Sequence, residues 1–251
     1  MIDGLTARRP DGLFRQLAVS LTVFLLAVGP SGRPAAAQIG HNPGSSPYRD
    51  VLLLPALSLY GGHLSADRGR VDAGPSNAST VGLRYELPSG KSMLFQFHLA
   101  YLMGDRFIID PRADSSSPQR KTGPYESNLL LTEIALNHRL TGAKTWHKFA
   151  PYLGVGLGLV FDVHSPGDTT RSGYNFGTKV SLGGAAGTRW YPFRGRVIIN
   201  AEARMQAWRL KYPASFHATL SPDGSRVVPI TAPLTDWTWH PWLSVGIGWN
   251  F

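Results

Sequence analysis

The last stretch of the chain alternates between two kinds of side chain. From Trp237 to Phe251 the odd positions are aromatic, aliphatic or proline, and the even positions are, apart from Trp242, small or polar. A period of two predicts a β-strand with one apolar face and one small or polar face. Such a strand is typical of a membrane β-barrel, in which one face contacts lipid and the other lines the lumen.

The same alternation recurs along the chain and predicts eight strands. They are expected at residues 51–61, 80–87, 93–101, 130–139, 149–164, 175–190, 197–206 and 237–251. The expected connections run long, short, long, short, long, short, long, with the short ones at 88–91, 141–148 and 192–195. The even number of strands and the alternation of long and short connections predict an all-β, eight-stranded, antiparallel up-and-down transmembrane barrel. Both termini would then lie on the side of the short turns, which is the periplasm in bacterial outer membranes.

Two details of phase follow from this pattern. In the first strand we expect Leu53, Leu57 and Leu59 on the outer face, although Leu52 and Leu54 also fit. In the strand at 175–190, we expect Phe176 to point outward with Val180 and Leu182.

Periodicity does not say which face is enclosed, so a soluble barrel must be weighed against a membrane barrel. The interior of an eight-stranded barrel is just wide enough for side chains or one small ligand. The face rich in Phe, Trp, Tyr, Leu and Ile would overpack that space, whereas the face rich in Gly, Ala and Ser fits it. The volume argument therefore places the apolar face in lipid.

A few long polar side chains share the inward phase. We expect a lumen network of ion pairs and hydrogen bonds in which Glu133 and Glu202 face Arg204, with His98 nearby, accommodated by the glycines of strands five and six, because charges in a confined space must pair or stay hydrated. The full candidate set is His98, Glu133, Lys179, Arg189, Glu202 and Arg204. This network either fills the interior or lines a narrow, gated solute path.

Catalytic, metal and cofactor sites are not predicted. A lipid A-modifying hydrolase would need Ser, His and an acid that converge. His138 has no obvious Ser and acid beside it. The pair of Asp162 and His164 lies beside Ser165 without an assigned third partner, and the pair of Asp236 and His240 likewise has no assigned third partner. No metal-ligand spacing and no phosphate-binding glycine loop is visible. The enzyme therefore remains an alternative, as does a soluble periplasmic lipid-binding barrel.

The N-terminus resembles a secretory signal peptide. It has a cationic start, an apolar run from Leu17 to Val28 and small residues at 35–37, so we expect cleavage before Gln38. The expected organisation is signal peptide 1–37, polar leader 38–49 and barrel domain 50–251.

The mature chain would carry a net charge of +7, because the full chain carries +9 and residues 1–37 hold four Arg and two Asp. These cations form no basic run, so nucleic acid is not an expected partner. The absence of cysteine excludes thiol-redox and disulfide-stapled classes.

Two motifs carry a resemblance to a known family. Residues 151–158 read Pro-Tyr-Leu-Gly-Val-Gly-Leu-Gly, and the last strand ends on the aromatic Phe251. Over residues 50–251 the chain resembles the small outer-membrane β-barrel superfamily that includes the OmpA/OmpX-type transmembrane domain. The resemblance implies a monomeric structural or adhesion-type membrane protein or a narrow pore, surrounded by outer-membrane lipids and recognised through Phe251 by the barrel-assembly machinery.

Overall fold

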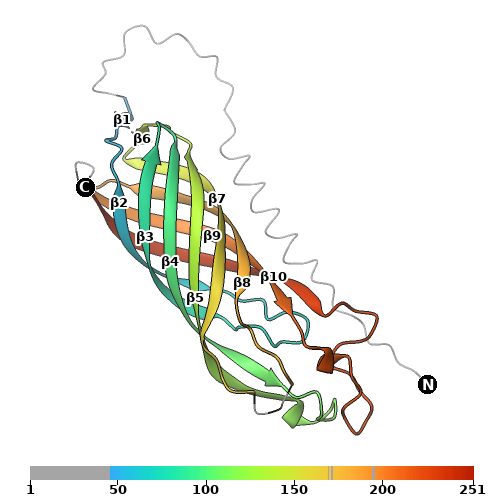
Figure 1. Ribbon diagram of the computed structural model, residues 1–251. Helices are drawn as coiled ribbons and strands as arrows, with labels where there is room; N and C mark the ends of the chain where they lie inside the picture. The colour runs from blue at the N-terminus through green and yellow to red at the C-terminus, as the bar shows by residue number, and fades with distance from the viewer. Residues whose placement is uncertain (1–45, 169, 171, 194–195) are drawn as a thin grey trace. The chain divides into compact units, whose positions relative to one another are not determined.

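The computed structural model describes residues 46–251 except 169, 171, 194 and 195. The predicted signal peptide and most of the predicted leader lie outside these residues and stay predictions. Within the described residues, eight long strands form a ring in which every neighbouring pair is antiparallel (Figure 1). They are β2 (Ala56–Leu64), β3 (Ala78–Ser89), β4 (Met93–Ile109), β5 (Lys121–Arg139), β7 (Phe149–His164), β8 (Lys179–Trp190), β9 (Val197–Lys211) and β10 (Thr235–Asn250). The prediction of an eight-stranded antiparallel barrel is confirmed.

The ring closes through the last strand. β10 pairs with β9 on one side and with β2 on the other, so its alternating sequence joins the two ends of the sheet. The connections along the ring alternate long and short, as predicted, and the three short ones share one end of the barrel with the C-terminus (Figure 1). We call this the turn end and the opposite end the loop end. No helix among the described residues is long and apolar enough to cross a bilayer.

The faces of the strands are as the volume argument predicted. Phe95, Leu157 and Ile247 are 44%, 58% and 58% exposed on the outside, whereas Glu133 and Arg204 are 3% and 5% exposed in the interior. The alternative of a soluble barrel with its apolar phase inside is therefore wrong, because those large side chains lie on the outer surface.

Several strands are longer than predicted at the loop end. β4 continues to Ile109 and β5 begins at Lys121, although the sequence favoured a loop over 105–124. Their pairing continues through a register shift between Arg106 and Ile108. The extension is held by the backbone ladder and by side-chain burial, since Ile109 belongs to the buried hydrophobic cluster and Phe107 packs against it. Two single-turn 3₁₀ helices, η2 (Pro118–Arg120) and η3 (Ala214–Phe216), lie in the long connections.

The predicted first strand is wrong over residues 51–55. The strand begins at Ala56, with Leu57 and Leu59 outward as expected, after Pro55, which has no backbone N–H to donate to the ladder. Before it, β1 (Tyr48–Asp50) pairs with β6 (Lys144–Trp146), a short strand inside the connection from β5 to β7.

Residues Val51–Pro55, which we call the mouth segment, cross the turn end of the barrel. In ring order the β5–β7 connection lies opposite β2, so the chain must traverse the opening to pass from β1 to β2. Five extended residues span about 17 Å, which suits a barrel of this size. Leu52, Leu53 and Leu54 line one small cavity together with residues from six strands of the barrel: Glu86, Leu94, Arg139, Arg189, Ile198 and Asn250.

The predicted sixth strand is wrong over residues 175–178. β8 begins only at Lys179, because Gly177 has a positive φ of 60° and its N–H bonds the Asn175 side chain at 2.9 Å, which turns the chain. Phe176 therefore folds inward and is 1% exposed, not outward as predicted.

Candidate functional site in the barrel lumen

The middle of the lumen holds a charged layer of residues from β3, β5, β7 and β9. Arg204 on β9 bridges two carboxylates, Glu133 on β5 and Glu202 on its own strand, the latter through Nε at 3.1 Å. Glu202 also accepts hydrogen bonds from Arg84 Nη2 at 3.0 Å and from the Tyr152 hydroxyl at 2.7 Å. Two cations therefore share the charge of Glu202, and no carboxylate of this group is left without a donor.

The glycines of β7 and β8 make room for Glu133. A Cβ atom on Gly183 would lie 2.8 Å from Glu133 Oε2, and one on Gly158 would lie 3.0 Å from Glu133 Cβ. A Cβ on Gly156 would collide with the Glu133 carboxylate. The carboxylate thus occupies space that side chains on the neighbouring strands would otherwise fill, and it also accepts a hydrogen bond from Gln206 Nε2 at 2.7 Å.

A second ion pair lies nearer the turn end. Arg189 on β8 donates through Nη2 to Glu86 Oε1 on β3 at 2.6 Å, with both side chains buried. Arg139 on β5 is buried in the same region, and no ion pair joins it to any residue that the structure describes. The two guanidinium groups therefore differ: one neutralises a buried carboxylate and the other does not.

The six predicted site residues lie in four different surroundings. Glu133, Glu202 and Arg204 lie in one network, and Arg189 lies in the neighbouring pair. His98 pairs in register with Glu133 but stacks against both the Tyr60 and the Trp242 rings, with centroids at 4.7 and 5.2 Å.

Lys179 lies apart from the network. It stands at the loop end of β8, half-buried, with its Nζ 5.6 Å from the centroid of the Phe176 ring.

Sequence reasoning missed several members of the network. Arg84 was not among the candidate residues, but it pairs in register with His98 and reaches Glu202. Tyr152 and Gln206 were not expected to take part. Their inward phase was a usable signal, because a buried hydroxyl or amide on the lumen face must find a partner.

The loop-end half of the lumen is filled by apolar side chains. Trp208, Trp242, Leu102, Leu129 and Leu131 are all buried in one hydrophobic cluster. Residues from the long connections, including Phe176, Phe216 and Val228, extend this cluster and cover it. At the other end, Val51 of the mouth segment packs against Ala56, Ala150, Tyr191 and Ile198. From the loop end to the turn end, the described lumen side chains therefore change from apolar to charged and back to apolar.

The candidate catalytic groups named from the sequence do not form a triad. His138 is exposed on the outer face and lies beside the Met93 sulfur at 3.3 Å. His240 points into the lumen and stacks on Trp208 with centroids 3.7 Å apart.

In the remaining two groups, Ser165 accepts a hydrogen bond from Arg106 Nε at 3.1 Å, and Asp236 accepts one from the backbone of Arg70 at 2.8 Å. In the described part of the chain, no group of three or more His, Asp or Glu side chains is arranged to hold a metal ion.

No protein-family model and no curated protein sequence matches the chain. Among solved structures, it is similar to Neisserial surface protein A (14% identity, TM-score 0.48, covering 78% of this chain and 97% of that one). It is also similar to the outer membrane protein OprG from Pseudomonas aeruginosa (12% identity, TM-score 0.48, covering 80% of this chain and 98% of that one). A third similar structure is Ail, the attachment invasion locus protein of Yersinia pestis (12% identity, TM-score 0.36, covering 80% of this chain and 100% of that one). These neighbours are small outer-membrane β-barrel proteins, the class that the strand pattern resembles.

Proposed function

We propose that this chain is an integral outer-membrane barrel with a structural or adhesion-type role and a closed lumen, its turn end facing the periplasm and its long connections facing outward. The observation that carries the proposal is the combination of a continuous apolar outer surface with buried apolar and charged side chains along the interior. The first feature suits hydrocarbon, and the second supports a closed lumen.

The height of the apolar belt supports membrane insertion. Trp237 and Trp239 are exposed at the loop end of β10, and Trp249 is exposed at its turn end. Ten residues separate Trp239 from Trp249. At about 3.4 Å per residue and a strand tilt of about 40°, this separation corresponds to about 26 Å, which matches an outer-membrane apolar band of about 25 Å. Aromatic residues at both edges suit the two membrane interfaces.

The long connections support a role at the surface. The Asp223 carboxylate accepts hydrogen bonds from the Ser115 backbone and hydroxyl, both at 2.9 Å, and the Asp223 backbone donates to Asp114 at 3.0 Å. Two connections that are far apart in sequence are thereby tied together. An ordered loop surface on a rigid barrel is the usual place for recognition.

Fractionation and gel migration test the location. The chain expressed in a Gram-negative host is expected in the outer-membrane fraction and should change its migration on a denaturing gel after boiling, because an unboiled barrel stays folded. Recovery in the soluble periplasm would contradict the proposal. Outer-membrane lipids as surroundings, recognition of Phe251 by the assembly machinery and a monomeric state belong to the same proposal.

Single-channel recording tests the closed lumen against the narrow pore. The purified barrel in planar bilayers is expected to give no discrete conductance steps, and Glu133→Ala should leave the record unchanged because apolar layers close both ends. Steps that are present in the parent protein and altered by Glu133→Ala would instead favour a gated path.

A further inference from the structure

The charges outside the lumen are distributed unequally between the two ends. The described residues within 65–77, 105–126, 162–178 and 209–236 at the loop end include nine cations and ten acids. The described residues at the turn end include five cations against one acid, Asp50; the cations are Arg49, Lys91, Lys144, Lys148 and Arg196. The described turn end therefore carries a net charge of +4, whereas the described loop end carries −1.

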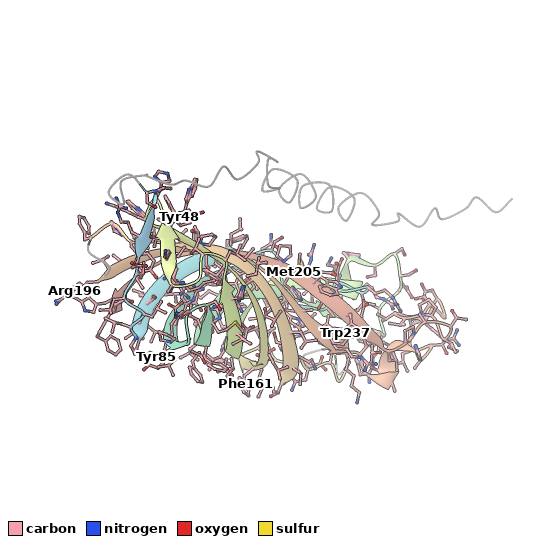
Figure 2. The ribbon with its side chains drawn as sticks, turned by 90° about the horizontal axis from the view of Figure 1, so that it is seen from above. Tyr48, Tyr85, Phe161, Arg196, Met205 and Trp237 are labelled. Carbon is pink, nitrogen blue, oxygen red and sulfur yellow. The ribbon has the colours of Figure 1, made fainter. Side chains whose placement is uncertain are left out.

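Some of these cations line an open groove of about 980 Å³ on the outside of the turn end. One wall is formed by Arg49 to Leu52, and the other by Tyr191 to Phe193 with Val197 and Trp249. Lys148 and Arg196 also line the groove. Figure 2 shows Arg196 and Tyr48 at the same end of the barrel, far from Trp237.

The lining of the groove combines cationic and apolar side chains with one acid, Asp50. Lys148 and Arg196 have no ion pair with the residues that the structure describes, and Lys148 Nζ contacts only the Pro192 carbonyl, at 3.3 Å. Phe193 and Trp249 are exposed beside them, and Trp249 is continuous with the outward apolar face of β10. The groove thus joins a cationic rim to the surface proposed to contact hydrocarbon.

We propose that this groove binds the phosphate-bearing headgroup of an anionic phospholipid of the periplasmic leaflet, with Lys148 and Arg196 at the phosphate and an acyl chain along Val197 and Trp249. Cationic side chains next to a membrane surface attract anionic lipid, and a guanidinium and an ammonium group together match phosphate oxygens. This inference rests on the proposed function, because it requires the turn end to lie at the periplasmic interface.

The test measures which lipid stays with the barrel. The folded full chain is inserted into vesicles of phosphatidylcholine with a minor fraction of phosphatidylglycerol, extracted in mild detergent, and analysed for co-purified lipid. Enrichment of phosphatidylglycerol over its mole fraction in the vesicles is expected. The double substitution Lys148→Gln with Arg196→Gln should lower the phosphatidylglycerol content to its mole fraction in the vesicles, because the charge-assisted hydrogen bonds proposed to hold the phosphate are lost.

A matched control separates the groove from the general charge of the turn end. Lys91→Gln with Lys144→Gln removes the same charge from the same end but leaves the lining of the groove intact. This variant should keep the enrichment. Equal losses in both double variants, or no enrichment in the parent protein, would overturn the site.

Two further readouts identify the source of any failure. Inorganic phosphate at millimolar concentration should not displace the lipid, whereas full displacement would indicate a free-phosphate site and overturn the assignment of a lipid. Heat-modifiable migration and protection from added protease are measured on the same vesicles. A protein that inserts but shows no lipid preference refutes only this inference, and one that fails to insert refutes the proposed function.

Discussion

The substitution Arg204→Met tests whether the charged layer is held by its ion pairs. Arg204 is buried and bridges Glu133 and Glu202. Removing it leaves Glu202 with Arg84 and Tyr152, but leaves Glu133 with only the Gln206 amide as a donor among the residues described. The loss of hydrogen-bond and charge partners therefore falls mainly on Glu133.

The expected magnitude follows from the burial of both partners. Breaking a buried ion pair by removing one partner typically lowers the free energy of unfolding by about 3–5 kcal/mol, because the remaining charge is desolvated without compensation. With a denaturant dependence of about 2–3 kcal/mol per molar urea, this loss lowers the unfolding midpoint by roughly 1–2.5 M. Adding Glu133→Gln removes the stranded charge, so the double variant should recover most of that loss.

The assay is urea unfolding of the barrel in lipid vesicles, followed by heat-modifiable gel migration or tryptophan fluorescence. The four proteins of the cycle are the parent, Arg204→Met, Glu133→Gln and the double variant, with Lys91→Met as a surface control that should not shift the midpoint. A midpoint for Arg204→Met within about 0.3 M of the parent value, or a double variant less stable than Arg204→Met, would refute the reasoning.

Three other substitutions test neighbouring contacts. Gly156→Ala places a methyl group against the buried Glu133 carboxylate, so its urea midpoint should correspond to a loss of about 1–3 kcal/mol in the free energy of unfolding. An unchanged midpoint would show that Glu133 can move aside without cost. Arg139→Met should leave the free energy of unfolding within about 1 kcal/mol of the parent value, whereas Arg189→Met, which strands its partner carboxylate, should lower it by about 3–5 kcal/mol; the reverse order would contradict the pairing seen here. The Ser221 hydroxyl and further hydroxyl and backbone donors in the loops hold the pKa of Asp223 below its ordinary value, so the carboxylate stabilises the loops above about pH 3.9 and this contribution is lost as the pH falls below that value. Asp223→Asn should therefore speed loop proteolysis at pH 7, and the difference from the parent protein should narrow as the pH is lowered below about 3.9; a difference that does not depend on pH would contradict this role.

The barrel itself could be predicted from sequence because two strong constraints agree. A period of two assigns every residue of a strand to one face, and the volume of an eight-stranded interior decides which face is enclosed. β10 satisfies both along its whole length. Where the chain leaves the ring, the period carries no information: Phe176 keeps the outward phase of β8 in sequence, but the turn at Gly177 reverses it.

The mouth segment could not be distinguished from a strand by its pattern. Val51 to Leu54 is an apolar run of the kind that strands use, and periodicity cannot separate a paired strand from an extended segment that packs on its side chains. Pro55 was the available cue, because a proline does not donate to a ladder. The pairing of β1 with β6 depends on a contact between residues nearly a hundred positions apart, which one sequence does not reveal.

The lumen network was predictable in composition but not in its pairs. Alternation gives the set of inward charges, whereas the pairs depend on how far each side chain reaches across the barrel and on which strands lie opposite one another. Arg84 shows the difference, since its register with His98 is local but its partner Glu202 lies across the ring on β9.

The glycines of β7 and β8 connect the space requirement of the lumen to its charge requirement. Glu133 lies against Gly156, Gly158 and Gly183, and the same carboxylate is the partner of Arg204. A side chain at any of these glycines must displace Glu133, and a displaced Glu133 loses its ion pair. Opening a solute path through this layer would therefore require the carboxylate and its cation to move together, and the apolar clusters at both ends would also have to separate. This coupling of volume and charge supports the proposal of a closed lumen, in which recognition takes place at the two ends of the barrel.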